Sequence, residues 1–264
     1  MNRGRSHRVL VRHWDGSSEH RRPDALVVEE PLTIELDDVI VTTTMRTPGH
    51  DFELAAGFCF TEGLLGAASI SAIRYCAKQR AVETEFNLVT VQTDGAPPAV
   101  PRLGLTTSAC GLCGAESIEA LSERLDPLPP IEPPLSADVL TALPERVRAC
   151  QDLFGATGGA LAAAAFGADG KPILIREDIG RHNAVDKVVG RMLLDGDLPA
   201  RGRGLFVSGR ASFEMVQKAW AAGFGVLAAV SAPSALAVET ASAAGLVLAG
   251  FVRNGQLNFY SPPV

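Results

Sequence analysis

The sequence predicts an α/β protein in two parts, a smaller β-rich α+β N-terminal domain and a C-terminal domain with a mostly parallel sheet. Of the 264 residues, 47% are apolar and 20% charged, which provides for a packed core, and the length fits two domains. Short apolar runs separated by turn residues fill the first half, whereas strands alternate with helical patterns in the second. The proline-rich stretch Asp126–Pro134 predicts a linker, so we assign residues 26–130 and 135–264 to the two domains.

The N-terminal domain is predicted to contain several short strands. They share a β-branched or alternating apolar pattern: Leu26–Val28, Leu32–Leu36, Val39–Thr44 and Phe86–Gln92. Asp37-Asp38 supplies a turn between the second and third of these. Asp51 follows a Pro-Gly breaker and is placed to cap a helix that runs to about Leu65.

Residues 1–25 are predicted to form a basic flexible tail, because six arginines and three histidines fall within the first 22 residues. The apolar run in this segment, Val9-Leu10-Val11, is too short for a secretory signal. No segment approaches the roughly 20 apolar residues of a membrane span. The net charge of −6 argues against a nucleic-acid or membrane-surface partner. We therefore expect a cytoplasmic protein.

The C-terminal domain repeats a strand–helix alternation. Its strands are predicted at Ile173–Ile175, Leu205–Val207, Gly225–Val230 and Leu246–Val252. Helices are predicted between them over Ala184–Leu193, Ala211–Ala222 and Pro233–Ala244. This alternation indicates βαβ units and a parallel sheet. The hairpin signal Asn254-Gly255 adds a last, antiparallel strand over Gln256–Tyr260.

Polar residues follow each strand of this domain. Because ligands of open α/β sheets bind beyond the carboxyl ends of the strands, we expect a site formed by four segments. These are Glu177–His182, Ser208–Arg210, Ser231–Ser234 and Phe251–Gln256. Arginines in three of the segments, and helix N-termini at Ala211 and Ser234, favour an anionic ligand such as a phosphate. Ordinary turn chemistry is the alternative for each segment taken singly.

Two positions in or next to these segments are candidates for contact with a ligand. Arg210, with Glu214 nearby, is the stronger candidate for a phosphate contact. His182 and Asp186 are spaced i, i+4, which is typical of an exposed pair on a helix. Their position at a strand end makes ligand contact the alternative.

Five cysteines, an odd number, in a chain without an export signal argue against a disulfide framework. Cys59, Cys76 and Cys150 are solitary, whereas Cys110 and Cys113 form a Cys-x-x-Cys pair. One such pair supplies only two of the four ligands of a structural zinc site, and the five histidines include no pair at ligand spacing. We therefore expect no tightly bound structural metal.

Two other Cys-x-x-Cys chemistries also fit poorly. A zinc deaminase needs His-x-Glu upstream and proline before the first cysteine. The chain has His50 and Glu53 one residue too far apart, and Ala109 in place of proline. A thioredoxin-type pair would follow an early strand of a βαβ unit, whereas a polar segment precedes Cys110.

A reactive thiol is the remaining interpretation. A helix predicted over Ala115–Leu125 begins just after Cys113, and a thiol near a helix N-terminus has a lowered pKa. The resulting thiolate can accept sulfur from a persulfide and pass it on by exchange. Cys113 could assist, resolve a disulfide or hold the outgoing sulfur. The spacing alone does not separate a sulfur carrier from a redox dithiol.

Seven segments together resemble the formate dehydrogenase accessory sulfurtransferases, the FdhD family. They are residues 29–34, 45–51, 61–65, 106–114, 176–187, 208–218 and 229–239. The resemblance extends from about Glu29 to Tyr260, and the combination of the cysteine segment with Asp-Ile-Gly-Arg-His-Asn is highly specific.

The resemblance implies a homodimer whose C-terminal domain has a cytidine-deaminase-like, three-layer α/β/α fold without the deaminase zinc site. It also implies a sulfurtransferase that takes persulfide sulfur from a cysteine desulfurase. The acceptor is the bis(molybdopterin guanine dinucleotide) molybdenum cofactor of formate dehydrogenase, before its insertion into the catalytic subunit.

The family's persulfide cysteine falls on Cys110, with Cys113 as the second member of the catalytic pair. The family's cofactor-binding loop falls on Phe251, Val252, Arg253, Asn254, Gly255 and Gln256. To these we add Arg210 and His182, because the phosphates of the dinucleotide would match the expected anion site.

Two departures from the family pattern are visible. Leu161 stands where many members have a histidine, and Arg253-Asn254-Gly255-Gln256 replaces the frequent Lys-Pro-Gly-Arg. The alternative function is a non-catalytic chaperone for the molybdenum cofactor, in which the cysteines position the metal centre. A Cys-x-x-Cys zinc or redox protein is the less favoured third hypothesis.

Overall fold

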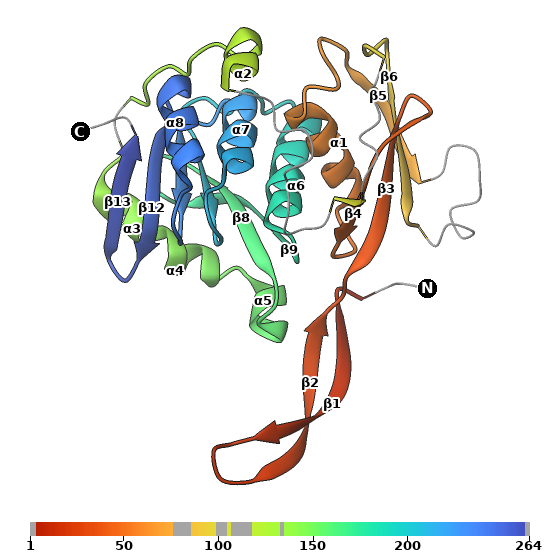
Figure 1. Cartoon of the computed structure of the whole chain (residues 1–264), viewed down its shortest axis with the longest axis vertical. Helices are drawn as coiled ribbons and strands as arrows, with labels where there is room; N and C mark the ends of the chain where they lie inside the picture. The colour runs from red at the N-terminus through yellow and green to blue at the C-terminus, as the bar shows by residue number, and fades with distance from the viewer. Residues whose placement is uncertain (1–3, 76–85, 99–104, 107–117, 133–134, 262–264) are drawn as a thin grey trace.

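The computed structural model describes residues 4–75, 86–98, 105–106, 118–132 and 135–261. They form two mixed α/β parts that lie side by side, with a two-stranded hairpin projecting from them (Figure 1). The α/β class predicted from the sequence is confirmed.

The N-terminal part contains a twisted sheet with the strand order β5-β6-β3-β4-β7. Its strands are β3 (Glu30–Leu36), β4 (Val39–Arg46), β5 (Ile70–Tyr75), β6 (Leu88–Thr93) and β7 (Leu105–Thr106). Helix α1 (Asp51–Thr61) packs on one face of this sheet and buries Leu54, Ala55 and Cys59 against the sheet residues Leu32 and Val89. Strands β3 and β4 and helix α1 lie close to the predicted ranges, whereas β5 has an exposed, weakly alternating sequence that gave no strand signal.

The C-terminal part contains a sheet with the strand order β13-β12-β11-β10-β8-β9. Its strands are β8 (Leu161–Phe166), β9 (Pro172–Asp178), β10 (Gly204–Val207), β11 (Val226–Ala229), β12 (Val247–Arg253) and β13 (Gln256–Ser261). Helices α6 (Arg181–Leu194), α7 (Phe213–Ala222) and α8 (Ala235–Ala244) alternate with them as predicted. The hairpin turn at Asn254-Gly255 is also confirmed, with positive φ at both residues.

This sheet is mixed rather than mostly parallel. Strands β10, β11 and β12 are parallel, but β8 is antiparallel to both β9 and β10, and β13 is antiparallel to β12. The prediction missed β8 because its sequence, Leu-Ala-Ala-Ala-Ala-Phe, lacks the β-branched residues that mark a strand. Strands β9 and β10 still run in the same direction and are joined through α6 as predicted, but β8 lies between them and is antiparallel to both.

Helices cover both faces of the C-terminal sheet. Helices α6, α7 and α8 bury one large core that includes Val188, Val216 and Ala241. The short helices α3 (Ala137–Thr141) and α4 (Leu143–Arg148) bury a second core around Phe206 on the opposite face. The expected three-layer α/β/α arrangement is therefore present, with α5 (Asp152–Thr157) leading into β8.

The segment predicted as a linker is docked on the C-terminal part. Helix α2 (Ile118–Arg124) places Leu121 in the larger core of that part. Beyond it, the Trp220 Nε1 atom donates a hydrogen bond to the Asp126 carbonyl at 2.8 Å, and the Leu128 N–H donates to the Ala244 carbonyl at 2.8 Å. The proline-rich composition therefore marks an extended strap along the C-terminal part and not a free spacer.

The basic segment predicted as a flexible tail is instead a β-hairpin. Strand β1 (Ser6–Trp14) pairs antiparallel with β2 (Glu19–Val27) along its full length. The many arginines of this segment are typical of a tail, but Val9, Val11 and His13 alternate with exposed residues, which is the pattern of a strand.

The two parts meet where helix α1 crosses helix α6. Gly57 and Gly190 lie at this crossing, where a Cβ on Gly57 would overlap the Asp186 carbonyl oxygen. Equally, a Cβ on Gly190 would overlap the Glu53 carbonyl oxygen. Only glycine permits two helix backbones to approach this closely, so the crossing fixes the N-terminal part against the C-terminal part.

Buried ion pairs reinforce this contact. Lys187 and Asp178 are both fully buried with Nζ 2.7 Å from Oδ2, and Lys187 also donates to the Thr47 carbonyl at 2.9 Å. Lys218 likewise donates to Asp186 at 2.9 Å and to Glu62 at 3.0 Å. Each cluster joins residues of α6 to the N-terminal part, so charges that lie inside the molecule are satisfied by partners from both parts.

A third cross-link joins α1 to β9. Arg176 donates to both carboxylate oxygens of Glu53, at 2.5 and 2.8 Å. Burial alone would raise the pKa of Glu53, but hydrogen bonds from Arg176 and from His50 lower it to about 2. The carboxylate is therefore charged at neutral pH, as a bidentate pair requires.

Candidate functional site at the carboxyl ends of the strands

The carboxyl ends of β9, β10, β11 and β12 lie along one edge of the C-terminal sheet, together with the start of β8. Backbone hydrogen bonds join the segments that follow them. The Ser231 N–H donates to the Gly209 carbonyl at 3.3 Å, and the Phe251 N–H donates to the Ser231 carbonyl at 3.2 Å. The Ser234 N–H donates to the Ala211 carbonyl at 3.0 Å. These bonds join the segments after β10, β11 and β12, and Arg181 brings the segment after β9 beside Gly209. The four predicted segments, with the second extended to Glu214, are called the strand-end site (residues 177–182, 208–214, 231–234 and 251–256).

Two arginines concentrate positive charge on this site. Arg181 begins helix α6, and its side chain lies over Gly209, with Leu161 packed beside the same glycine. Burial, together with the neighbouring charge of Arg210, lowers the pKa of Arg181. Arg181 is half-buried beside a second positive charge, and a bound anion would stabilise both guanidinium groups. Arg210 is among the predicted site residues and Arg181 is not, although each is the single arginine of its predicted segment.

A polar group next to the arginines is incompletely hydrogen-bonded. His182 Nε2 lies 3.9 Å from Glu214 Oε2, within ion-pair range but beyond hydrogen-bond distance. Within the described residues, Arg181 Nε, His182 Nε2 and Ser212 Oγ are buried without a hydrogen-bond partner. Contact with His182 and, to a smaller extent, with Ser212 outweighs burial and lowers the pKa of Glu214 to about 2. Unsatisfied donors of this kind fit a ligand with acceptor oxygens.

The helix N-termini add to the positive potential. Helix α7 begins after Ser212, whose side chain makes no capping hydrogen bond, and α6 begins after Gly180, which has no side chain to cap it. Helix α8 differs, because Ser234 Oγ accepts from the Ala237 N–H at 3.2 Å. The starts of α6 and α7 therefore direct free N–H groups to the same edge as Arg181 and Arg210.

The predicted cofactor loop forms the far end of the strand-end site. It is the tip of the β12–β13 hairpin, in which Arg253 pairs with Gln256 across the turn. Val252 is buried, whereas Arg253, Asn254, Gly255 and Gln256 are exposed. Phe251 adopts a positive φ of 53°, and its ring centroid lies 5.6 Å from the Arg253 guanidinium. The loop thus presents one arginine and several backbone groups to solvent.

One predicted pairing is wrong. His182 and Asp186 do not form an exposed i, i+4 pair, because Asp186 is buried and bonded to Lys218 and to Thr61 Oγ1 at 2.9 Å. His182 faces Glu214 instead. The i, i+4 rule predicted a solvent-exposed helix face, but α1 packs on this face of α6 and buries it.

Cys110 and Cys113 lie outside the described residues, as does Cys76. Cys59 is buried, and desolvation, with smaller effects of nearby carboxylates, raises the pKa of its thiol to about 12. Cys150 is exposed. In the part of the chain that the structure describes, no three His, Cys, Asp or Glu side chains are grouped as metal ligands.

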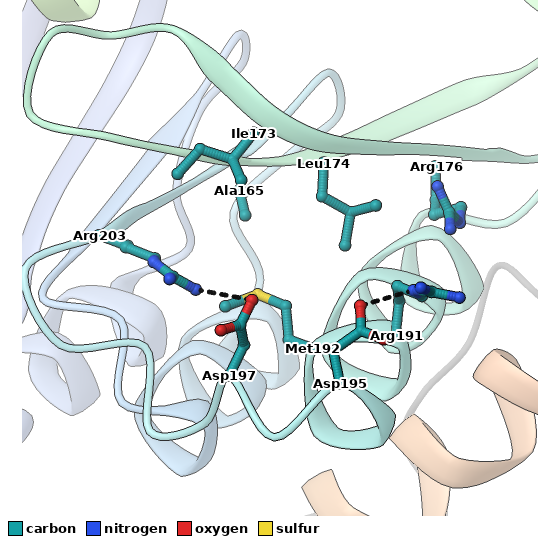
Figure 2. A pocket seen from close by; sticks show the side chains of 9 residues that line it. All are labelled: Ala165, Ile173, Leu174, Arg176, Arg191, Met192, Asp195, Asp197 and Arg203. Carbon is teal, nitrogen blue, oxygen red and sulfur yellow. Dashed lines mark hydrogen bonds and ion pairs between the residues drawn. The ribbon is translucent and has the colours of Figure 1, made fainter.

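A shallow pocket lies at the opposite edge of the C-terminal sheet. Figure 2 shows its charged wall, where Arg203 Nη1 lies 3.5 Å from Asp197 and Arg191 Nε lies 2.7 Å from Asp195. Arg191 is hydrogen-bonded to Asp195, whereas Arg203 Nη1 lies within ion-pair range of Asp197 but makes no hydrogen bond. The pocket contains none of the residues predicted for ligand binding, so we assign the site to the strand ends.

The fold and the strand-end site define a two-part α/β protein with arginines gathered at the carboxyl ends of its C-terminal strands. None of its described helices is long and apolar enough to span a membrane. The chain belongs to the FdhD/NarQ family, whose profile matches residues 27–264.

Relatives match over nearly the whole chain. A "Sulfur carrier protein FdhD" of Streptomyces avermitilis is 48% identical over 99% of this chain and 95% of its own length. The protein of the same description from Nocardia farcinica is 49% identical over 93% of this chain and 89% of its own. A crystal structure from Desulfotalea psychrophila, described as a formate dehydrogenase accessory protein, matches 98% of both chains with a TM-score of 0.76 at 21% identity. This last likeness supports the fold.

Proposed function

We propose that this protein is a sulfur carrier for formate dehydrogenase, in which Cys110 carries the sulfur as a persulfide. The observation that supports the proposal most directly is the Cys-Gly-Leu-Cys-Gly segment in a member of the FdhD/NarQ family. Relatives that match it over nearly their full length are described as sulfur carrier proteins. The sulfur donor would be a cysteine desulfurase, and the target would be the catalytic subunit of formate dehydrogenase.

The loading step is a thiol exchange. The Cys110 thiolate attacks the terminal sulfur of the donor persulfide, a new S–S bond forms at Cys110, and the donor cysteine leaves as a thiolate. No net oxidation occurs. Cys113 can then attack Sγ of Cys110, which forms a Cys110–Cys113 disulfide and releases the sulfur as hydrosulfide. A thiol reductant restores the pair.

The cargo site is proposed at the strand ends. The guanine dinucleotide of the molybdenum cofactor carries phosphates, whose oxygens match the unpartnered donors of Arg181, His182 and Ser212 and the charge of Arg210. Residues Phe251–Gln256 would contact the cargo farther along the same edge. Leu161, which stands where many family members have a histidine, lies beside Arg181 near Gly209. Leu161 therefore borders the proposed cargo site.

A non-catalytic cofactor chaperone is the second candidate. The observation in its favour is that the described residues of the strand-end site, among them Arg181, His182 and Ser212, already supply groups that fit an anion and include no thiol. The two functions differ in what Cys110 must do, because a carrier gains sulfur and a chaperone does not. We further propose a homodimer in the cytoplasm.

Sulfur loading tests the carrier proposal. The purified protein is incubated with a cysteine desulfurase and cysteine, then alkylated, digested and examined by mass spectrometry. We expect one additional sulfur atom on the peptide that contains Cys110 and none on the peptide with the exposed Cys150. Loading on neither member of the pair would favour the chaperone.

Nucleotide binding tests the cargo site. With guanosine diphosphate as the probe, we expect Arg181→Ala and Arg210→Ala each to weaken binding by about tenfold, the effect of one lost charge-assisted hydrogen bond. Titration calorimetry measures the affinity. Arg191→Ala is the matched control, because Arg191 lies at the opposite edge and pairs with Asp195. Equal affinities for all three variants would place the anion elsewhere.

A further inference from the structure

The β1–β2 hairpin is a formed arm that projects away from the two parts of the molecule (Figure 1). At its tip, Asp15 Oδ1 accepts hydrogen bonds from the Ser17 and Ser18 N–H groups at 2.9 and 2.8 Å, and Gly16 supplies the positive φ that the turn requires. These hydrogen bonds lower the pKa of Asp15, so its carboxylate holds the turn at neutral pH. The arm is therefore specified as a hairpin by its own sequence.

The arm contacts the rest of the chain only at its base, among the described residues. Arg5 Nη2 donates to the Glu177 carbonyl at 3.1 Å, and Val27 packs against Gly159. An isolated two-stranded hairpin is marginally stable in water and is usually stabilised by a third strand or a packed surface. The part of the arm beyond its base would therefore gain stability from a partner surface.

One face of the arm has the composition of an interface. In a strand, alternate residues share a face, so Leu10, Arg12 and Trp14 project together, with Pro23 and Arg21 opposite the first two. We call these five residues the arm face. Leu10 is 65% and Trp14 64% exposed, which makes them the most exposed large apolar side chains of the described chain. Trp and Arg are the residue types most enriched at the centres of protein interfaces.

The charge of the arm indicates the nature of the partner. The first 27 residues contain six arginines against three acidic residues, a net charge of +3, so residues 28–264 carry −9 of the total of −6. Arg12 and Arg21 are directly opposite each other, and like charges in that position destabilise a hairpin. Arg12 Nη1 lies 3.5 Å from Glu19 of the same hairpin, so Arg21 is the member of this pair that a counter-charge on a partner would cover. Within the described residues, Arg8, Arg21 and Arg22 make no ion pair. A partner with apolar patches and a net negative charge fits this arm, and the body of a second copy has that charge.

We propose that the arm face of one copy lies on the body of a second copy, in a dimer in which the arms are exchanged reciprocally. The proposal rests on the homodimer of the proposed function and specifies how it is held together. Because the arm is anchored beside Glu177, at the end of β9, the exchange would place the second copy next to the strand-end site.

Photo-crosslinking of mixed copies tests the exchange. A photoreactive phenylalanine analogue replaces Trp14 in the full-length protein, and ¹⁴N-labelled and ¹⁵N-labelled copies are mixed, irradiated and digested. We expect crosslinked peptides that join the arm of one label to residues 28–264 of the other. Crosslinks found only within one label, or only to added formate dehydrogenase, would overturn the proposal.

Matched variants measure what the arm face contributes. Leu10→Ser with Trp14→Ser is expected to raise the dimer dissociation constant by about 100-fold or more, the effect of removing a central aromatic anchor. Sedimentation velocity measures it, and higher salt should weaken the wild-type dimer because the attraction is partly ionic. Ile173→Ser with Leu236→Ser is the control, since both residues are exposed apolar side chains outside the arm.

The outcomes separate this proposal from the others. A wild-type dimer unaffected by the arm variant would overturn the exchange and leave the dimer standing, whereas a monomeric wild type would overturn both. Sulfur loading of Cys110 is read independently by mass spectrometry. Its failure would overturn the carrier function without altering the oligomeric result.

Discussion

Replacing Cys110 by alanine is expected to reduce formate dehydrogenase activation by about 100-fold or more in cells that depend on this protein, because the sulfur-carrying nucleophile is lost. The measurement is formate-dependent dye reduction in extracts of a strain that lacks its own family member. The purified variant should also gain no sulfur from a desulfurase. Its melting temperature should equal that of the wild type.

Two other cysteine variants serve as controls for this result. Cys150→Ala removes an exposed thiol that lies outside the pair, and we expect full activation. Cys113→Ala should still load sulfur on Cys110 and lose only the steps that need a resolving thiol. Full activation by Cys110→Ala would contradict the carrier function, whatever the other two variants do.

Removal of the buried Asp178 carboxylate is expected to destabilise the fold by about 3–5 kcal/mol, the usual cost of breaking a buried ion pair. Asp178 accepts hydrogen bonds from Lys187, the Thr47 N–H, the Gly180 N–H and Asn183. Asp178→Ala removes the acceptor of all four and leaves the buried Lys187 charge without a counter-charge, although Lys187 and Asn183 keep their hydrogen bonds to the Thr47 and Met45 carbonyls. Lys187→Met should cost less, because the carboxylate keeps its other three donors. Urea unfolding measures both.

An exposed pair of equal length provides the control. Arg191 Nε and Asp195 Oδ2 are also 2.7 Å apart, but both side chains are more than 40% exposed. Water screens that pair, so Asp195→Ala should change the free energy of unfolding by about 0–1 kcal/mol. Similar losses for Asp178→Ala and Asp195→Ala would show that burial at the contact between the two parts does not determine stability.

Much of the C-terminal fold was predictable because its signals are local. Glycines follow the predicted helices before β11 and β12, and Asn254-Gly255 specifies its own hairpin. Where the signals are not local, the predictions failed. The alanine-rich strand β8 is a strand only because β9 and β10 flank it, and no pattern within its own six residues could indicate this.

The candidate site was also predictable only in part. The alternation of strands and helices predicts that the strand ends lie together, and Arg210 is one of the site residues predicted from it. Residues 177–182, which lie in the family-like segment 176–187, were predicted to border a ligand. The structure divides it: Asp178, Asn183, Asp186 and Lys187 are buried at the contact between the two parts, whereas Arg181 and His182 face the strand-end site. Sequence spacing cannot make this distinction, because it depends on helix α1 covering one side of α6.

The glycine crossing of α1 and α6 has a consequence for how this chain can diversify. Gly57 and Gly190 are far apart in the sequence, yet a side chain at either position would collide with the backbone of the other helix. A recombination event between α2 and α3 would place α1 of one parent against α6 of the other. Such a hybrid could assemble only if each parent contributed a glycine at its side of the crossing, so exchange of halves is restricted to relatives that have kept both glycines.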